Sequence, residues 1–136
     1  MLEEEAAGQA AQNRRTTDLV RLQALMEQDR SLVGPDNQTQ IATNLEFHAA
    51  FWSAAHNRVL EDLLDRLSTH SVHAPHSTLS VGHRWEDALD EHDALLDAIR
   101  DRWVSDARSI ARTHMETART LRLQLLYRWI PAHGRT

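Results

Sequence analysis

The spacing of apolar residues along the chain predicts helices over most of its length. Apolar side chains recur every three or four positions, which places them on one face of an α-helix. The first helix is expected from Met1 to about Asn13, and the second begins at Thr16 or Thr17, either of which can cap it. We expect these two helices to pack as a hairpin. The stripe of the second helix consists of Leu19, Leu22, Leu25 and Met26.

Turn-forming residues separate the next two helices. Gly34 and Pro35 interrupt the chain before a third helix, which should end at Asn57 because asparagine tolerates left-handed backbone. A fourth helix follows and should fray or end near Pro75. The stripe of the third helix is Ile41, Leu45, His48, Phe51, Trp52 and Ala55, and that of the fourth is Val59, Leu60, Leu63, Leu64 and Leu67.

Two more helices are expected in the rest of the chain. One should run from about Arg84 to Ile99, and the other from Ser105, which can cap it, to about Trp129 before Pro131. The composition agrees, since only 4 glycines and 3 prolines interrupt 136 residues. The sequence therefore predicts an all-α fold, an antiparallel bundle of about six helices that forms one domain over the whole chain.

Charge and cysteine content limit the possible functions. The net charge is −5 and the basic residues are spread along the chain, so this chain alone is not expected to bind nucleic acid. The lack of cysteine excludes disulfides and thiolate metal sites. There is no apolar run long enough to cross a membrane and no signal peptide, so we expect a cytoplasmic protein.

Three of the nine histidines lie within apolar helical patterns. His48, His92 and His114 are each expected to point inward from a different helix, and Asn44 lies one turn before His48. Burying an imidazole without a strong partner costs about 1–3 kcal/mol, and a bound cation removes that cost. The pattern alone leaves two alternatives open: a shared divalent metal, or core histidines satisfied by their neighbours.

Four other histidines lie in a less regular stretch around Pro75. Spacing of three could align the first two for a second metal site. We expect solvent-exposed histidines instead, because the region lacks an apolar period. These residues are His70, His73, His76 and His83.

Three segments, taken in order, resemble elements of one protein family. They are NLEFHAAFWSAAHN, ALDEHDALLDAI and ARSIARTHM, and the intervals between their histidines also resemble those of the family's metal-binding members. The family is FCD, the FadR C-terminal domain, which is the effector-sensing half of many GntR-type bacterial transcription regulators. With LEEEAAGQAA similar to its opening helix, the likeness covers nearly the whole chain.

This resemblance implies a metal-dependent sensor. Asn44, His48, His92 and His114 would bind one divalent cation, with zinc expected first and nickel, iron or manganese as alternatives. The implied partners are a small carboxylate effector and a second copy of the chain. The family tends to carry basic residues near the pocket at the positions of Arg66 and Arg84; the alternative is that both are solvated arginines paired with nearby aspartates.

The chain departs from the family at two places. Asn44 stands where the family often has aspartate, which predicts weaker metal binding and a stronger pull on an anion. Arg102 and Trp103 replace a Gly-Asp pair before the last helix. We therefore expect Ser105 to cap that helix instead. No helix-turn-helix segment precedes the sensing helices, so we expect either a fragment of a longer regulator or a stand-alone domain.

A metalloenzyme is the alternative function. Three histidines around an open metal also describe the site of a hydrolase, lyase or cyclase, which would need a nearby general acid or base. The nearest candidates in sequence are Glu46, Glu91 and His56, and both glutamates are expected to face away from the site. No nucleophile elbow, phosphate loop or HExxH pattern is present. The regulator is therefore the expected function, and a metal-free dimerisation module is a third possibility.

Overall fold

The computed structural model describes residues 1–72 and 78–133, and this part of the chain forms six α-helices and one short 3-10 helix. The prediction of an all-α bundle of about six helices is confirmed. None of the described helices is long and apolar enough to cross a membrane. The elements are α1 (Leu2–Asn13), α2 (Thr16–Ser31), α3 (Asn37–Ala54), α4 (Arg58–Val72), η1 (Thr78–Ser80), α5 (Arg84–Arg100) and α6 (Val104–His133).

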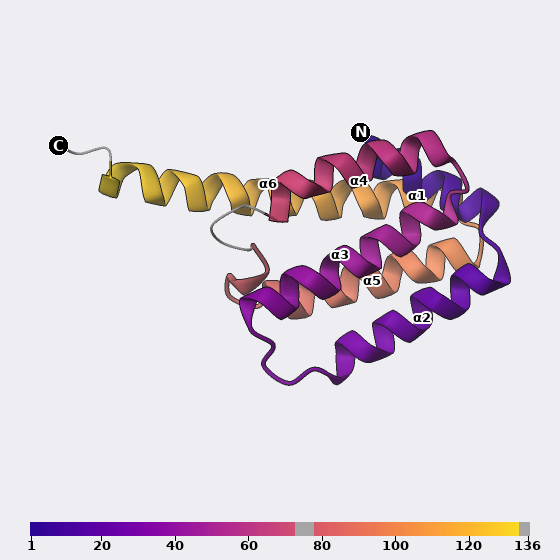
Figure 1. The fold of residues 1–136 in the computed structure, drawn as a ribbon, viewed down its shortest axis with the longest axis horizontal. Helices are drawn as coiled ribbons and strands as arrows, with labels where there is room; N and C mark the ends of the chain where they lie inside the picture. The colour runs from indigo at the N-terminus through magenta and orange to yellow at the C-terminus, as the bar shows by residue number, and fades with distance from the viewer. Residues whose placement is uncertain (73–77, 134–136) are drawn as a thin grey trace.

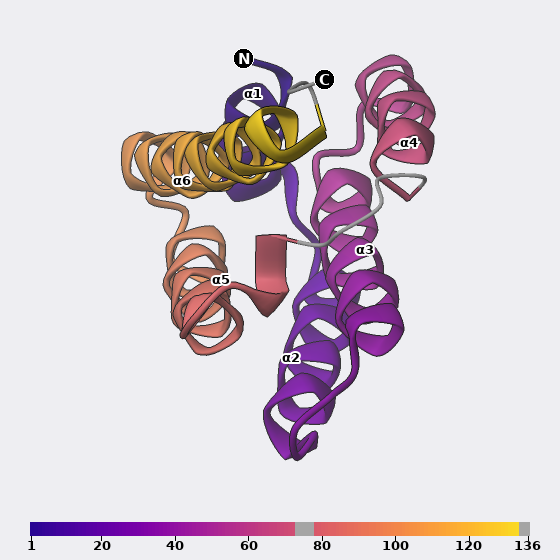
Figure 2. The same ribbon diagram turned by 90° about the vertical axis from the view of Figure 1, so that its left-hand side faces the viewer.

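The first helix contacts four of the five other α-helices. α1 contacts α3, α4, α5 and α6, whereas α2 packs against α3 and α5 (Figure 1, Figure 2). The predicted hairpin of the first two helices is therefore wrong. Alanines on α1 explain its position, because small side chains let four other helices approach closely. Ala6, Ala7, Ala10 and Ala11 are all fully buried.

α3 buries more than one face. It contacts α1, α2 and α4, which lie on different sides of it (Figure 2). Phe47, outside the predicted stripe, is consequently among the largest fully buried side chains, while Ile41 and Leu45 are only half-buried. α4 buries only one narrow face. Leu60 and Leu64 of its predicted stripe are buried, and the other three residues of the stripe are exposed, namely Val59, Leu63 and Leu67.

The junctions around α2, α3 and α4 differ from the predicted caps. Asp18 accepts the backbone N–H of Arg15 at 2.7 Å at the start of α2, so neither threonine caps that helix. His56, with φ +52°, takes the left-handed position after α3. Asn57 instead caps α4, because its Oδ1 accepts the backbone N–H of Leu60 at 3.2 Å.

The turn between α5 and α6 contains Arg102 in a left-handed conformation, with φ +59°. Such a conformation costs a non-glycine residue about 1–2 kcal/mol. The Arg102 side chain offsets part of this cost, because its Nη1 donates to the carbonyl oxygen of Gln12 at 2.7 Å, at the C-terminal end of α1. α6 begins at Val104 rather than at the predicted Ser105.

Two further side chains tie this end of the bundle together. Asn13 Nδ2 donates to the carbonyl oxygen of Ala55 at 2.8 Å, directly after α3. Arg14 Nη2 donates to the carbonyl oxygen of Arg100 at 2.6 Å, at the end of α5. The C-terminal ends of α1, α3 and α5 are therefore joined by side chains that satisfy otherwise unpaired carbonyls.

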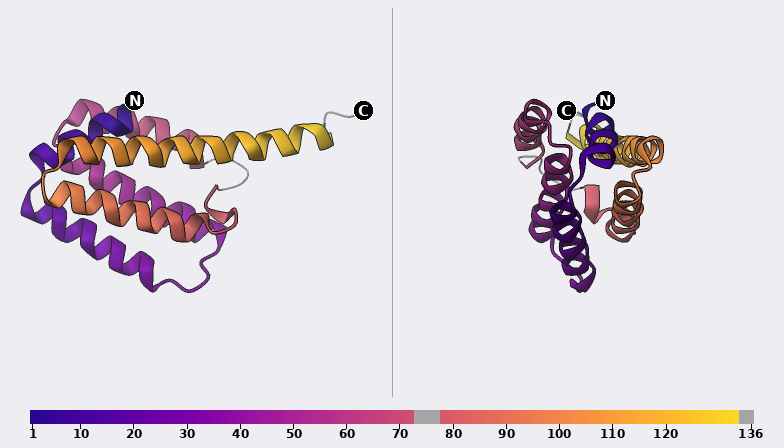
Figure 3. Two further views of the ribbon diagram at one scale, coloured as in Figure 1. Left: turned by 180° about the vertical axis from the view of Figure 1, so that it is seen from behind. Right: turned by 90° about the vertical axis from the view of Figure 1, so that its right-hand side faces the viewer.

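α6 continues beyond the bundle and past the predicted end at Trp129. The helix runs to His133, with Pro131 in its last turn, and its second half projects from the other helices (Figure 1, Figure 3). Proline has no backbone N–H to donate to the preceding turn, and the helix ends two residues after Pro131.

Asp29, on α2, is a buried carboxyl group that opposes folding at neutral pH. The residue is 2% exposed, and burial together with the charge of Glu46 raises its pKa from 3.8 to about 6. The folded protein therefore holds the Asp29 proton more tightly than the unfolded chain does. This group's contribution to stability falls as pH rises through the window between those two pKa values.

We predict that Asp29→Asn stabilises the metal-free protein at pH 7.5 by roughly 1–3 kcal/mol, with little gain at pH 4. Urea unfolding at both pH values, in the presence of a chelator, measures the difference. Glu27→Gln, an exposed change on the same helix, should have almost no effect at either pH. A gain of equal size for Asp29→Asn at both pH values would contradict the prediction.

Candidate metal centre

Three imidazoles from three helices meet inside the bundle. They belong to His48 on α3, His92 on α5 and His114 on α6, and one nitrogen of each lies within 4.8 Å of the others. The side chains are enclosed, since the three residues are only 6%, 3% and 8% exposed. Among the residues that the structure describes, no other group of three or more potential ligands from histidine or carboxylate side chains is this closely spaced.

Several polar atoms of this cluster have no hydrogen-bond partner. They are Nε2 of His48, both ring nitrogens of His92, and Oδ1 of Asn44, and all are buried. Buried polar atoms in proteins are nearly always paired, so unpaired lone pairs at one place call for an explanation. A divalent cation fits this donor set, because imidazole nitrogen and amide oxygen are both metal ligands.

His92 is held by an apolar contact. Its ring stacks on Phe47 with a centroid distance of 4.2 Å and an interplanar angle of 11°. Burial, with smaller effects from His48 and His114, puts the pKa of His92 well below its ordinary value. Burial also lowers the pKa of His114, although Glu91 opposes this. Both imidazoles are therefore neutral at pH 7, which is the form that binds metal.

Behind His114 lies a carboxylate that is itself held by an arginine. Oε1 of Glu91 is 2.6 Å from Nδ1 of His114, and both Nη atoms of Arg84 donate to the same carboxylate, at 2.6 and 2.8 Å. Since a carboxylate only accepts, Nδ1 of His114 must carry the proton. The 3.3 Å approach of Arg84 Nη2 to that nitrogen is then a close contact rather than a hydrogen bond. Nε2 of His114 keeps its lone pair.

The expected orientation of Glu91 is wrong. Its carboxylate contacts His114 instead of facing away from the site. Arg84, seven positions earlier on α5, bonds to the same carboxylate and holds it there. Burial raises the pKa of Glu91, but the hydrogen bonds from His114 and Arg84 outweigh this and lower it to about 2. Glu91 is therefore a weak base, and the spacing of Arg84 and Glu91 was the signal that could have revealed their pairing.

Glu3, in the first turn of α1, is a second carboxylate beside the cluster. Its Oε2 accepts the indole N–H of Trp52 at 3.0 Å and lies 3.6 Å from Nδ1 of His48, which is an ion-pair distance rather than a hydrogen bond. Glu3 is 8% exposed. Burial raises the pKa of Glu3, but His48 and Trp52 together lower it by more. The pKa therefore lies below its ordinary value, and the carboxylate stays ionised at pH 7. Sequence reasoning missed this contact because it joins residues far apart in the chain.

Arg84 does not fit the alternative interpretation of a solvated arginine. It is 5% exposed and paired with Glu91, so it is not a solvated arginine with an aspartate partner. Arg66 lies exposed on α4, and no described side chain of that helix belongs to the histidine cluster.

The remaining predicted site residues lie elsewhere. His83 is exposed at the start of α5, while the side chains of His70, His73 and His76 fall outside the described residues. Of the two other acid–base candidates, Glu46 is exposed and His56 bonds to Asp18 at 2.7 Å.

Of the two larger grooves beside α5, one reaches the cluster and the other does not. The groove between α5 and α6, of about 450 Å³, includes Glu91 and His114 in its wall, together with Asp87 and Asp90. This acidic wall suits the entry of a cation.

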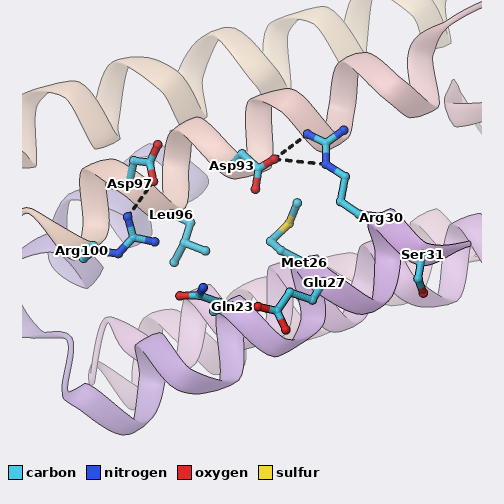
Figure 4. Close-up of a pocket in the computed structure, with 9 residues that line it drawn as sticks. All are labelled: Gln23, Met26, Glu27, Arg30, Ser31, Asp93, Leu96, Asp97 and Arg100. Atoms are coloured by element: carbon cyan, nitrogen blue, oxygen red, sulfur yellow. Dashed lines mark hydrogen bonds and ion pairs between the residues drawn. The ribbon is translucent and has the colours of Figure 1, made fainter.

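The other groove, of about 440 Å³, lies between α2 and α5. In Figure 4, Arg30 of α2 faces Asp93 across it, and Arg100 pairs with Asp97 along α5. No histidine lines this groove, so it is separate from the candidate metal centre.

Comparison with protein families and with curated proteins gives one match. The model of the FCD domain family matches residues 1–117, which include Asn44 and all three clustered histidines. The match ends within α6, so the projecting part of that helix lies beyond it. No curated protein matches the chain.

Proposed function

The chain belongs to the FCD domain family, the effector-binding regulatory domain of GntR-type transcription regulators, and we propose that it senses small organic acids through a bound divalent metal. The observation that carries this proposal is the set of buried, unpaired donor atoms on Asn44, His48 and His92, beside His114. No catalytic group is assigned, because Glu91 is held as a weak base by its two partners.

The metal would be held by Asn44 Oδ1, by Nε2 of His48 and His114, and by one nitrogen of His92. Three imidazoles with one neutral oxygen suit zinc, which we propose first, and also nickel, iron or manganese. Bound there, the cation would act as a Lewis acid that accepts a carboxylate oxygen from the effector.

We predict that the wild-type protein binds one zinc ion per chain. His92→Ala should weaken zinc binding by more than about 100-fold, because it removes a ligand from the centre of the cluster. Asn44→Asp should strengthen it, because a carboxylate replaces a neutral amide. Competition with a chromogenic chelator measures each affinity.

His56→Ala is the matched control, since His56 is bonded to Asp18 outside the cluster and its loss should leave zinc affinity unchanged. Equal zinc affinity in wild type and His92→Ala would refute the site.

Net charge at the site favours an anionic effector. The two charges of a divalent cation and the charge of Arg84 exceed the charges of Glu3 and Glu91 by one, while Asn44 and metal-bound imidazoles would add none. Arg84 is the stronger candidate for contact with the effector, because it lies beside His114 and its Nε atom has no partner. Arg66 is the weaker candidate because it is exposed on α4.

We predict that succinate raises the melting temperature of the zinc-loaded protein and leaves that of the chelated protein unchanged, because the carboxylate needs the metal. Succinamide, which has the same shape without charge, should have no effect on either form. In Arg84→Lys the succinate response should shrink, since lysine cannot reproduce the arginine fork. An equal shift with and without zinc would count against metal-dependent sensing.

We also propose that the chain forms a homodimer through α4. Val59, Leu63 and Leu67 recur at every fourth position on one face of this helix and are 72%, 44% and 53% exposed. Three exposed apolar residues in one row are typical of an interface.

We predict that Leu63→Asp converts the dimer into a monomer, because it places a charge in the apolar row. Sedimentation velocity measures the change. Val20→Asp is the control, because Val20 is an exposed apolar residue on α2 that lies outside this row. A dimer that persists in Leu63→Asp would rule out this surface.

A further inference from the structure

We infer that Glu3 is a positioning residue of the metal centre, which orients His48 through its Nδ1 atom and connects the first turn of α1 to the bound cation. The inference rests on the metal site proposed above and adds a residue that does not itself bind the metal.

Glu3 differs from its two acidic neighbours in what it contacts. Glu4 pairs with Arg112 and Glu5 pairs with Arg108, both on α6. The ion-pair contact of Glu3 is with His48, and its hydrogen bond comes from Trp52. A buried ionised carboxylate is costly unless a positive group or several donors compensate it. Glu3 receives a hydrogen bond from the indole N–H of Trp52, and a cation on the far side of His48 would add a positive charge close to the carboxylate.

The contact also fixes which nitrogen of His48 can bind metal. With Nδ1 facing a carboxylate, the proton is favoured on Nδ1, and the lone pair remains on Nε2. Nε2 is the atom that the structure leaves buried and unpaired. A carboxylate behind a metal-binding histidine orients the ring and increases its basicity.

The same arrangement occurs on the opposite side of the cluster. Glu91 lies behind Nδ1 of His114, as Glu3 lies behind Nδ1 of His48. Their surroundings differ, because Glu91 is shared with Arg84, whereas Glu3 has no arginine contact among the described ion pairs. Glu3 therefore supplies a negative charge without an arginine partner among the described ion pairs, beside a site whose oxygen donor, Asn44, is neutral.

The test is zinc affinity in Glu3→Gln, which keeps the size of the side chain and an acceptor for Trp52 but removes the charge. We expect a loss of about 10- to 100-fold. Glu5→Gln is the matched control, because Glu5 lies in the same turn and bonds to Arg108. The zinc affinity of the Glu5→Gln variant should match that of wild type. In a His48→Ala background the effect of Glu3→Gln should largely disappear, because Glu3 acts through His48.

A second measurement needs no metal. Nitrogen-15 chemical shifts of His48 in the chelated protein should report the Nδ1–H tautomer in wild type and a mixture of both tautomers in Glu3→Gln. Far-UV circular dichroism confirms that the variant folds, and Glu3→Asp, which keeps the charge, should retain more zinc affinity than Glu3→Gln.

Three results would overturn the inference. The first is zinc binding by Glu3→Gln as tight as that of wild type, and the second is an equal loss with and without His48. The third is an unchanged tautomer of His48 in Glu3→Gln. If wild type itself binds no zinc, the proposed metal site fails as well, which separates that outcome from a failure of Glu3 alone.

Discussion

The burial of three imidazoles at one point is the constraint on which the rest of the site depends. Each ring has two nitrogens, and neither can be left without a partner in the core at low cost. The fold places a carboxylate behind two of the rings and an aromatic face against the third, through Glu3, Glu91 and Phe47. The nitrogens that remain unpaired are Nε2 of His48 and both ring nitrogens of His92, so the cost falls within the cluster, where a cation would remove it.

The ion pairs on the two sides of α5 differ in how much stability is lost when one partner is removed. Arg84 is buried and holds Glu91 in a two-pronged pair, so that losing either partner would leave a charge in the core. Arg30 pairs with Asp93 on the exposed side of the same helix, where water screens the interaction. One helix therefore carries an exposed set of ion pairs on one side and a buried set at the candidate site on the other.

Local patterns predicted most of the helices and the inward direction of three histidines, because helical period determines which residues share a face. They could not locate α1, whose alanines fit equally well in several surroundings. They also could not reveal Glu3 beside His48, since that contact joins residues that are distant in the chain and requires the packed bundle. Asn57 was correctly expected at a helix boundary but on the wrong side of it, because asparagine is suited both to ending a helix and to capping one.

α1 has unlike ends. Its C-terminal end is joined to its neighbours by Asn13, Arg14 and Arg102, whereas Glu3 at its other end contacts the candidate metal centre. At about 1.5 Å per residue the helix is roughly 18 Å long, so this single element spans the distance between the candidate metal centre and the junction at the opposite end of the bundle.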